Sequence, residues 1–462
     1  MLKESNSLHN LKSLLKFGLI CITVSTLFPV IYANAQIPNA LTLVDSMHLS
    51  IAVSGSDSTG GSDVWGWTGP DLTEYAFMGY VNGTAVIRTT PVLEIVDTIP
   101  GPKLNDFYYH RDYEVYRNYL YIVHENRGTN EGMSVVDLSF LPDSVHLVGV
   151  FNTNNSGQTR SHNIFIDTTK GFAYLEGSFS NQVHIHNLSD PENPVYLNSF
   201  GTAGSSIHDG WADNDTVYLA EGSSGNWSVW DLSNKLSPSM IVRVSPPAAG
   251  YVHNIWLSPD RQYCATTEET GFKTVKIWDI SNFANITLVG EYLGSSNLTH
   301  DVRWMDDIIV ISHYEAGVTV IDVTDPATPV EVAQYDTYPL SDAVAFHATW
   351  GVFPYTKNNT VYASDLEGFF WVLQLEYDFT CPIVVTGDIN GDELLNASDI
   401  IATVDFVFKS GPAPQPCQAA ADSNCDGVVT AADVIYMVNH VFKSGAPPCD
   451  VCSLIPDQWL CP

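Results

Sequence analysis

The 462-residue sequence is poor in basic residues: it has 19 Lys and Arg against 52 Asp and Glu, for a formal net charge of −33. A field of this sign repels nucleic acid and anionic membrane surfaces, so neither is an expected partner, while divalent cations and neutral partners stay open. The sequence also lacks the GxSxG and HExxH motifs, which removes two common signatures of hydrolases.

Long apolar runs are equally scarce, and the one that stands out lies at the N-terminus, over residues 17–32. It follows three lysines and precedes the small-residue triplet Ala33-Asn34-Ala35. This order predicts a signal peptide over residues 1–35 and a secreted protein, extracellular or associated with a cell surface. No later segment is apolar enough to cross a bilayer, so we expect no membrane span.

Cysteine is rare in the large central part of the chain, where only Cys264 occurs, within a strand-like segment that predicts a buried thiol. The other mature cysteines share the last 82 residues; they are Cys381, Cys417, Cys425, Cys449, Cys452 and Cys461. In an exported protein such clustering indicates disulfides that stabilise a small domain. Six cysteines allow 15 pairings, and the sequence does not choose among them.

Helix-period segments are almost absent between residues 40 and 378, which instead hold short runs of Val, Ile, Tyr, Phe and Trp separated by turn residues. Six histidines recur there at intervals of 52, 46, 45, 47 and 47 residues; they are His110, His162, His208, His253, His300 and His347. Repeats of this length are typical of propeller blades.

Each repeat contains four strand-like runs, as in HNIFID, FAYLEGS, QVHIHNLSD and PENPVYLNSF. An atypical first unit carries Asp63 where the others carry histidine, which brings the count to seven blades. The last unit lacks a fourth strand, and we expect Leu41 to Leu49 to supply it and close the ring. The predicted fold is mainly β: a seven-bladed β-propeller of four-stranded blades over residues 36–380, followed by a small α-helical domain.

The segments NGTAVIRTT, VTVIDVTDPATPV and VHIHNLSDPENPV resemble the LVIVD repeats of propellers in the family called choice-of-anchor B, and more distantly the WD repeats. The resemblance covers about residues 40–378. It implies a shared propeller with interchangeable C-terminal attachment devices, and it assigns no activity.

Residues 381–448 hold two copies of a calcium-loop pattern 34 residues apart, DINGDELLNASD and DSNCDGVVTAAD. Every second side chain in such a loop turns an oxygen toward one point, as a hard cation with six to eight oxygen ligands requires. We therefore predict two Ca²⁺ ions in a dockerin-like calcium-binding domain, with the remaining residues, 449–462, forming a Cys-containing tail. The expected side-chain ligands are Asp388, Asn390, Asp392, Asn396 and Asp399 in the first loop and Asp422, Asn424, Asp426, Thr430 and Asp433 in the second, with the backbone carbonyls of Leu394 and Val428 at position 7.

Each loop runs into a helix that ends in FKSG, and position 12 is Asp rather than Glu. Both features resemble a type I dockerin, which implies a cohesin-like or cell-surface protein as partner. Positions 10 and 11, where dockerins are recognised, hold Ala397 with Ser398 and Ala431 with Ala432. The alternative is a pair of acidic turns that hold no metal.

Six glutamates follow the six histidines; they are Glu125, Glu176, Glu221, Glu268, Glu315 and Glu367. We expect His and Glu to meet within each blade, either as a hydrogen bond that locks the turn or as part of a ring on the propeller face that holds a metal or polar ligand. The structural interpretation is favoured, because blade geometry would repeat it in nearly every blade. An aromatic residue follows closely after the histidine position of each blade. These residues are expected to pack between blades, with sugar stacking as the alternative; they are Trp65, Tyr113, Phe165, Trp211, Trp256, Trp304 and Trp350.

Two functions remain open at this stage. The first is a non-enzymatic binding or display propeller, attached through the calcium module to an extracellular partner or surface. The second is a glycoside hydrolase or other polysaccharide-processing protein that its dockerin recruits, as the association of dockerins with cellulosomes implies. A deep axial cavity with two unpaired carboxylates would favour hydrolysis, and a glycan would then be the ligand.

Overall fold

The computed structural model describes residues 41–49, 60–102, 110–128, 130–176, 182–294, 297–341, 343–376, 383, 385–392, 394–409, 411–415, 417–443 and 445–454. The predicted signal peptide, Cys381 and Cys461 lie outside these residues. Within them, no helix combines the length and the apolar character that a membrane crossing needs.

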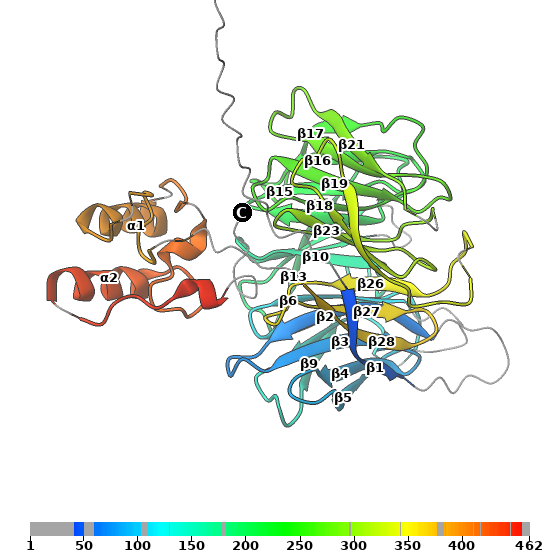
Figure 1. Cartoon of the computed structure of the whole chain (residues 1–462), viewed down its shortest axis with the longest axis horizontal. Coiled ribbons are helices and arrows are strands. Elements are labelled where there is room, and N and C mark those ends of the chain that lie inside the picture. Colours follow the sequence, from blue (N-terminus) through cyan, green and yellow to red (C-terminus); the bar gives the residue numbers. More distant parts are fainter. Residues whose placement is uncertain are drawn as a thin grey trace, which may run out of the picture. The chain divides into compact units, whose positions relative to one another are not determined.

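The chain folds into seven antiparallel sheets of four strands each, which confirms the predicted seven-bladed propeller (Figure 1). The first strands of the blades contact one another in chain order, and the first strand of blade seven returns to that of blade one. These seven strands therefore surround a common axis. They are β2 (Gly61–Thr68), β6 (Arg111–Tyr116), β10 (Asn163–Asp167), β14 (Asp209–Asp213), β18 (Val252–Leu257), β22 (Val302–Met305) and β26 (Thr349–Phe353).

The second and third strands of each blade are buried on both faces, because neighbouring blades pack against them. Their runs of Val, Ile, Leu and aromatic residues suit such a position. The second strands are β3 (Glu74–Tyr80), β7 (Tyr119–His124), β11 (Phe172–Glu176), β15 (Thr216–Ala220), β19 (Tyr263–Glu268), β23 (Ile308–Ser312) and β27 (Thr360–Asp365). The third strands are β4 (Gly83–Arg88), β8 (Met133–Asp137), β12 (Val183–Asn187), β16 (Trp227–Asp231), β20 (Val275–Asp279), β24 (Val318–Asp322) and β28 (Phe369–Leu375).

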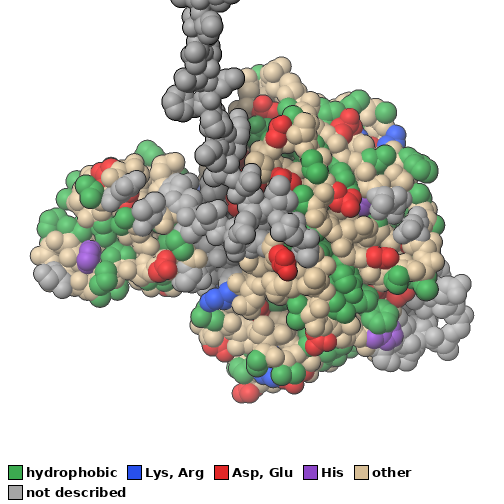
Figure 2. Space-filling view, in the orientation of Figure 1, with side chains coloured by type: hydrophobic (Ala, Val, Ile, Leu, Met, Phe, Trp, Pro, Cys, Tyr) green, Lys and Arg blue, Asp and Glu red, His purple; other side chains and the backbone are tan. Residues whose placement is uncertain are grey.

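The outermost strands are more exposed than the second and third strands. In blades one to six they are β5 (Glu94–Pro100), β9 (His146–Phe151), β13 (Val195–Phe200), β17 (Ser239–Val244), β21 (Thr287–Tyr292) and β25 (Val330–Tyr335). Acidic side chains are spread over the face drawn in Figure 2, and basic ones are few there, in keeping with the net charge.

The fourth strand of blade seven comes from the other end of the propeller sequence. Strand β1 (Leu41–His48) pairs antiparallel with β28, from Leu41 opposite Leu375 to His48 opposite Phe369. The two lie side by side in Figure 1 although more than 300 residues separate them. The predicted latch is thus confirmed, and it leaves blade seven with the same four strands as the others.

Removing the latch should destabilise the ring. The side chains of Leu41 and Leu49 are buried, and burying a leucine contributes about 1.5–3 kcal/mol. We expect a chain that begins at residue 51 to melt several degrees below one that begins at residue 36, as measured by calorimetry. A chain that begins at residue 41 keeps β1 and serves as the control. Equal melting temperatures for all three would contradict a latching role.

The C-terminal module contains two helices of equal length, α1 (Ala397–Lys409) and α2 (Ala431–Lys443), which lie side by side (Figure 1). Thr403 and Met437, on equivalent turns, are buried in contact with each other. Short 3₁₀ turns, η1 (Gln418–Ala421) and η2 (Val451–Leu454), complete the module. Val451 packs against Ile383 and Ile389, so this part of the predicted tail belongs to the core of the module.

Both helices end in the same way, which the repeated FKSG predicts. The Gly411 amide donates to the Asp405 carbonyl, and the Gly445 amide donates to the Asn439 carbonyl, each at 2.9 Å. Each bond joins residues six positions apart and closes a turn at the C-terminal end of its helix. A Cβ atom on Gly411 would lie 2.8 Å from the Asp405 backbone, so glycine is required there.

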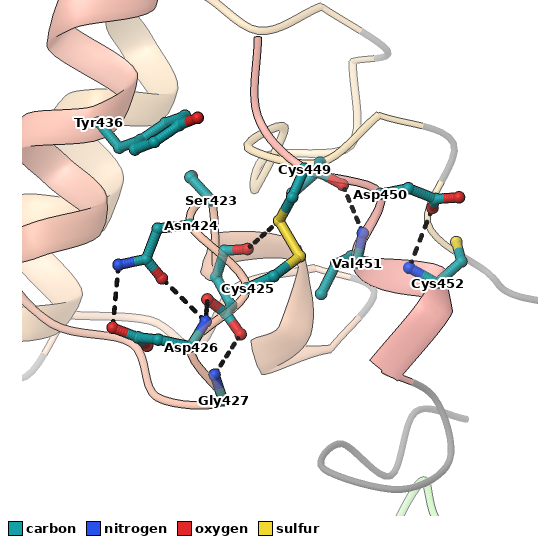
Figure 3. Close-up of a disulfide and its surroundings, with 12 residues drawn as sticks. Ser423, Asn424, Cys425, Asp426, Gly427, Tyr436, Cys449, Asp450, Val451 and Cys452 are labelled. Carbon is teal, nitrogen blue, oxygen red and sulfur yellow. Dashed lines mark hydrogen bonds between the residues drawn. A yellow bond between two sulfur atoms is a disulfide. The ribbon is translucent and has the colours of Figure 1, made fainter. Parts of the chain in front are cut away.

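Among the described cysteines, the structure pairs Cys425 with Cys449 (Figure 3). This disulfide ties the second calcium-type loop to the segment before η2. Cys417 and Cys452 are also disulfide-bonded. Cys264 is a buried free thiol, as expected.

Candidate functional site

Each of the two loops before the helices gathers three carboxylates. Asp388, Asp392 and Asp399 form one group, and Asp422, Asp426 and Asp433 form the other. Within each group, one oxygen from every residue lies within 4.8 Å of the others. The first and last aspartates of each loop are buried, whereas the middle one is exposed.

The last aspartate holds both ends of its loop in the same way in the two copies. Asp433 accepts hydrogen bonds from the amides of Ser423 at 2.9 Å and Thr430 at 2.8 Å. Asp399 accepts the equivalent bonds from Ile389 at 3.3 Å and Asn396 at 2.9 Å. The two loops therefore fold alike although only five of their twelve residues are identical.

The remaining predicted oxygen ligands also lie along these turns. The Asn390 and Asn424 side-chain oxygens accept from the amides two residues on, each at 3.0 Å. The side-chain oxygens of Asn396 and Thr430 accept from Ser398 and Ala432 in the same manner. Figure 3 shows Asn424 and Asp426 turned toward each other beside the disulfide. Such sets of oxygens suit a hard divalent cation.

A second candidate site lies at the propeller axis, where five of the six periodic histidines come together. Their rings form a continuous series from blade to blade, with centroids 3.9 Å apart for His110 and His162, 4.3 Å for His162 and His208, 4.1 Å for His208 and His253, and 4.2 Å for His253 and His300. All five side chains are buried.

The sixth member of the series is Trp350 rather than His347. Its ring centroid lies 4.2 Å from that of His300 and 6.0 Å from that of His110. The amide after each ring residue donates to a hydroxyl of the second strand: Asp301 to Ser312 in blade six, and Gly351 to Ser364 in blade seven. Trp350 therefore occupies the position of His300, and the histidine period is out of register by three residues in blade seven.

A small polar cavity lies beside this series. Five carboxyl groups line it together with one guanidinium group, that of Arg303; the carboxyl groups belong to Asp63, Asp112, Glu114, Asp209 and Asp301. Its volume of about 20 Å³ suits a water molecule or a single ion. Asp63, which the sequence placed in the histidine position of blade one, thus does reach the axis.

Burial sets the protonation of these carboxyl groups. It raises the pKa of Asp63 to about 6, against the lowering effect of its hydrogen bond with Asp112, and it raises the pKa of Asp112 well above the usual value. Asp301 differs: burial would raise its pKa, but His300, His253 and Arg303 outweigh burial and hold the pKa below the usual value. The surroundings of Asp301 therefore favour its charged form, whereas burial favours the neutral forms of Asp63 and Asp112.

The histidines next to Asp301 differ as well. Burial lowers the pKa of His300 to about 4, so this ring is neutral near pH 7. Its Nδ1 lies 2.7 Å from the Trp350 carbonyl, which only accepts, so Nδ1 carries the hydrogen and Nε2 keeps its lone pair. Burial opposes a charge on His253 too, but the carboxylates of Glu269 and Asp301 raise its pKa.

The six glutamates do not form a ring of pairs with the histidines. The expected pairing within a blade holds for His347 with Glu367, at 2.9 Å, and for His110 with Glu125, which lie within 4.8 Å. Glu125 also contacts His162 of the next blade, at 3.4 Å.

The other four glutamates have different surroundings. Glu221 binds Arg243, Glu268 binds Lys276, and Glu315 accepts the Ala343 amide. Glu176 is buried, its carboxylate oxygens have no hydrogen-bond partner among the described residues, and burial raises its pKa well above the usual value. The expectation of one His–Glu pair in every blade is therefore wrong, because these turns use different partners.

The periodic aromatic residues pack mainly inside the propeller, as expected. Tyr113 and Trp304 are buried, and Trp65 packs against Phe353 of the neighbouring blade at 5.2 Å. Trp256 lies under the Arg303 guanidinium, 4.4 Å from it. Trp350 is the exception, since it belongs to the axial series.

The seven similar sheets around one axis define a β-propeller that is built from sequence repeats. Among solved structures, the chain is similar to the WD40 β-propeller domain of Doa1, with 12% identity over 72% of this chain and 97% of that chain, and a TM-score of 0.49. It is also similar to Raptor from Chaetomium thermophilum, with 10% identity and a TM-score of 0.54 over 74% of this chain but 30% of that one. At such identities the likeness concerns the fold alone.

Two segments of the propeller match a family of sequence repeats. The LVIVD repeat family matches residues 249–294 and 309–337, which contain blade five and most of blade six. This confirms the predicted LVIVD repeats in these two segments. No curated protein matches the chain.

The assignment of Lys276 as the partner of Glu268 can be tested by mutation. Lys276 Nζ lies 2.6 Å from Glu268 Oε1, and both side chains are almost fully buried. Lys276→Met would leave a buried carboxylate without its cation, which costs about 3–5 kcal/mol. We expect urea unfolding at pH 7 to show a decrease of this size in the free energy of unfolding.

Arg88→Met is the matched control, because the Arg88–Glu94 pair is more exposed and worth at most about 1 kcal/mol. A Lys276 variant as stable as the control would contradict a stabilising role for the Glu268–Lys276 ion pair.

Proposed function

We propose that this is a secreted protein whose propeller binds or displays a partner without catalysis, and whose C-terminal module binds two Ca²⁺ ions and attaches the protein to an extracellular partner. The observation that carries the proposal is the pair of matching loops, each with three convergent carboxylates and the same hydrogen bonds to its last aspartate. Oxygen ligands at positions 1, 3, 5, 9 and 12 are those that calcium loops use.

The surface of the module supports a protein as the partner. Three pairs of apolar side chains are exposed at equivalent positions of the two copies: Leu394 and Val428, Ile401 and Ile435, and Phe408 and Phe442. Apolar side chains are visible on the surface of this module in Figure 2. Exposed apolar groups in a repeated arrangement are typical of a docking surface, and a cohesin-like domain is the partner that the dockerin resemblance implies.

The axial cavity supports a role without catalysis. At about 20 Å³ it is far too small for a sugar ring, and its charged carboxylate, Asp301, lies against His253 and Arg303. A glycoside hydrolase needs two carboxyl groups on opposite sides of a bound sugar. The described axial residues leave no room for that arrangement.

Calcium should stabilise the C-terminal module. We expect about two ions to bind per chain in titration calorimetry, and calcium at 100 times its Kd to add about 2.7 kcal/mol per site. Asp433→Asn and Asp399→Asn should each remove one site, because each neutralises the carboxylate that closes its loop. Asp450→Asn, outside both loops, should retain both. A full-length chain whose stability does not change between calcium and a chelator would reject the assignment.

The apolar pairs on the helices should carry the attachment. The double variant Ile401→Asp and Ile435→Asp should lose calcium-dependent capture of partners from the secreted proteins of the source, whereas each single variant retains one copy of the surface. Leu340→Asp places the same charge at an exposed leucine of the propeller and should capture normally. Full capture by the double variant would exclude this surface.

A further inference from the structure

Three buried ligand atoms at the propeller axis lack hydrogen-bond partners. They are His253 Nδ1, His300 Nε2 and Asp301 Oδ1, in side chains of residues that are 2%, 3% and 6% exposed. A buried polar atom without a partner costs about 1–3 kcal/mol. His253 Nδ1 and Asp301 Oδ1 face each other at 3.3 Å, so His300 Nε2 is the atom that the described protein groups leave unsatisfied.

The potential ligand atoms of His253, His300 and Asp301 also lie close together. One ligand atom from each lies within 4.8 Å of the others, and His253 Nδ1 is 3.3 Å from Asp301 Oδ1. This separation equals that between neighbouring ligands of a tetrahedral zinc ion, about 3.3 Å for bonds of about 2.0–2.1 Å. The same three residues line the 20 Å³ cavity, which has room for one ion.

The surrounding residues orient these ligands. His300 donates its Nδ1 hydrogen to the Trp350 carbonyl, which directs the lone pair to Nε2. Metal-binding histidines are held in this way, by donation of the second ring nitrogen to a carbonyl or carboxylate. On His253, the Glu269 carboxylate faces Nε2 at 4.0 Å and the Asp301 carboxylate faces Nδ1 at 3.3 Å, so a metal at Nδ1 would replace the hydrogen that lies between His253 and Asp301.

Ionisable groups of both signs line the cavity. Five carboxyl groups line the cavity with only the Arg303 guanidinium among them as a permanent positive charge. A divalent ion at Asp301 would take the place of the hydrogen that His253 shares with this carboxylate.

We propose that His253, His300 and Asp301 bind a first-row divalent transition metal such as Zn²⁺ at the propeller axis. Two imidazoles and one carboxylate suit this class of ion, whereas Ca²⁺ requires oxygen ligands throughout. The site is thus chemically distinct from the two loops, and it depends on neither the calcium ions nor the attachment. Its ligands come from blades five and six, so the metal would link neighbouring blades.

The test is zinc binding by the full-length chain after treatment with a chelator, with calcium kept saturating so that both loops are filled. Elemental analysis after dialysis should find one zinc per chain. His300→Ala and Asp301→Asn should weaken zinc binding by at least about tenfold. His146→Ala removes an exposed histidine of β9 and should bind as the unchanged chain does, and Asp399→Asn with Asp433→Asn should also keep its zinc.

Several results would overturn the proposal. One is a folded wild-type chain that takes up no zinc; the three residues would then form an imidazolium–carboxylate pair only. Another is normal zinc affinity in Asp301→Asn, whose shape is unchanged. Should His300→Ala fail to fold, anomalous diffraction from the zinc-loaded wild-type chain decides: a peak among the three residues supports the site, and a peak elsewhere contradicts it.

Discussion

The architecture depends on the hydrogen bonds between β1 and β28. Without them the sheet of blade seven would end in an open edge, and only the packing of β2 against β26 and β27 would join the first blade to the last. Closure fixes seven inner strands around one axis, so that residues far apart in sequence, such as Asp63, His300 and Trp350, meet there. The axial site is therefore a product of ring closure and not of any single repeat.

At the axis, repeated sequence positions acquire different roles. His300 is neutral and donates to a carbonyl of the next blade, whereas His253 lies between two carboxylates that favour its charged form. Asp112 and Asp63 share a hydrogen bond, and Asp301 remains charged. These protonation states differ because many buried polar groups share one small volume, and the pKa of each group depends on the charges around it. The seven blades are alike in backbone and unlike in chemistry.

The sequence predicted most of the fold because propeller blades repeat, and repetition makes weak strand signals add up. It placed the latch, the four-strand units and both calcium-type loops, whose ligand spacing is local. It failed where the outcome depends on register or on partners distant in sequence. His347 matches the histidine period, yet Trp350 takes the axial position, and the glutamates bind Arg243, Lys276 or a backbone amide as well as histidine. Neither could be read from spacing alone.

The pairing of Leu41 with Leu375 also sets how the propeller would respond to force. Both ends of the propeller chain leave from the same end of one antiparallel strand pair, so tension between them would unzip that pair one bond at a time. Tension between the C-terminal exit and the body of the propeller would instead shear β28 against β1 and β27 together. A protein tethered by its C-terminal module and held by its blades is thus loaded along its mechanically stronger direction.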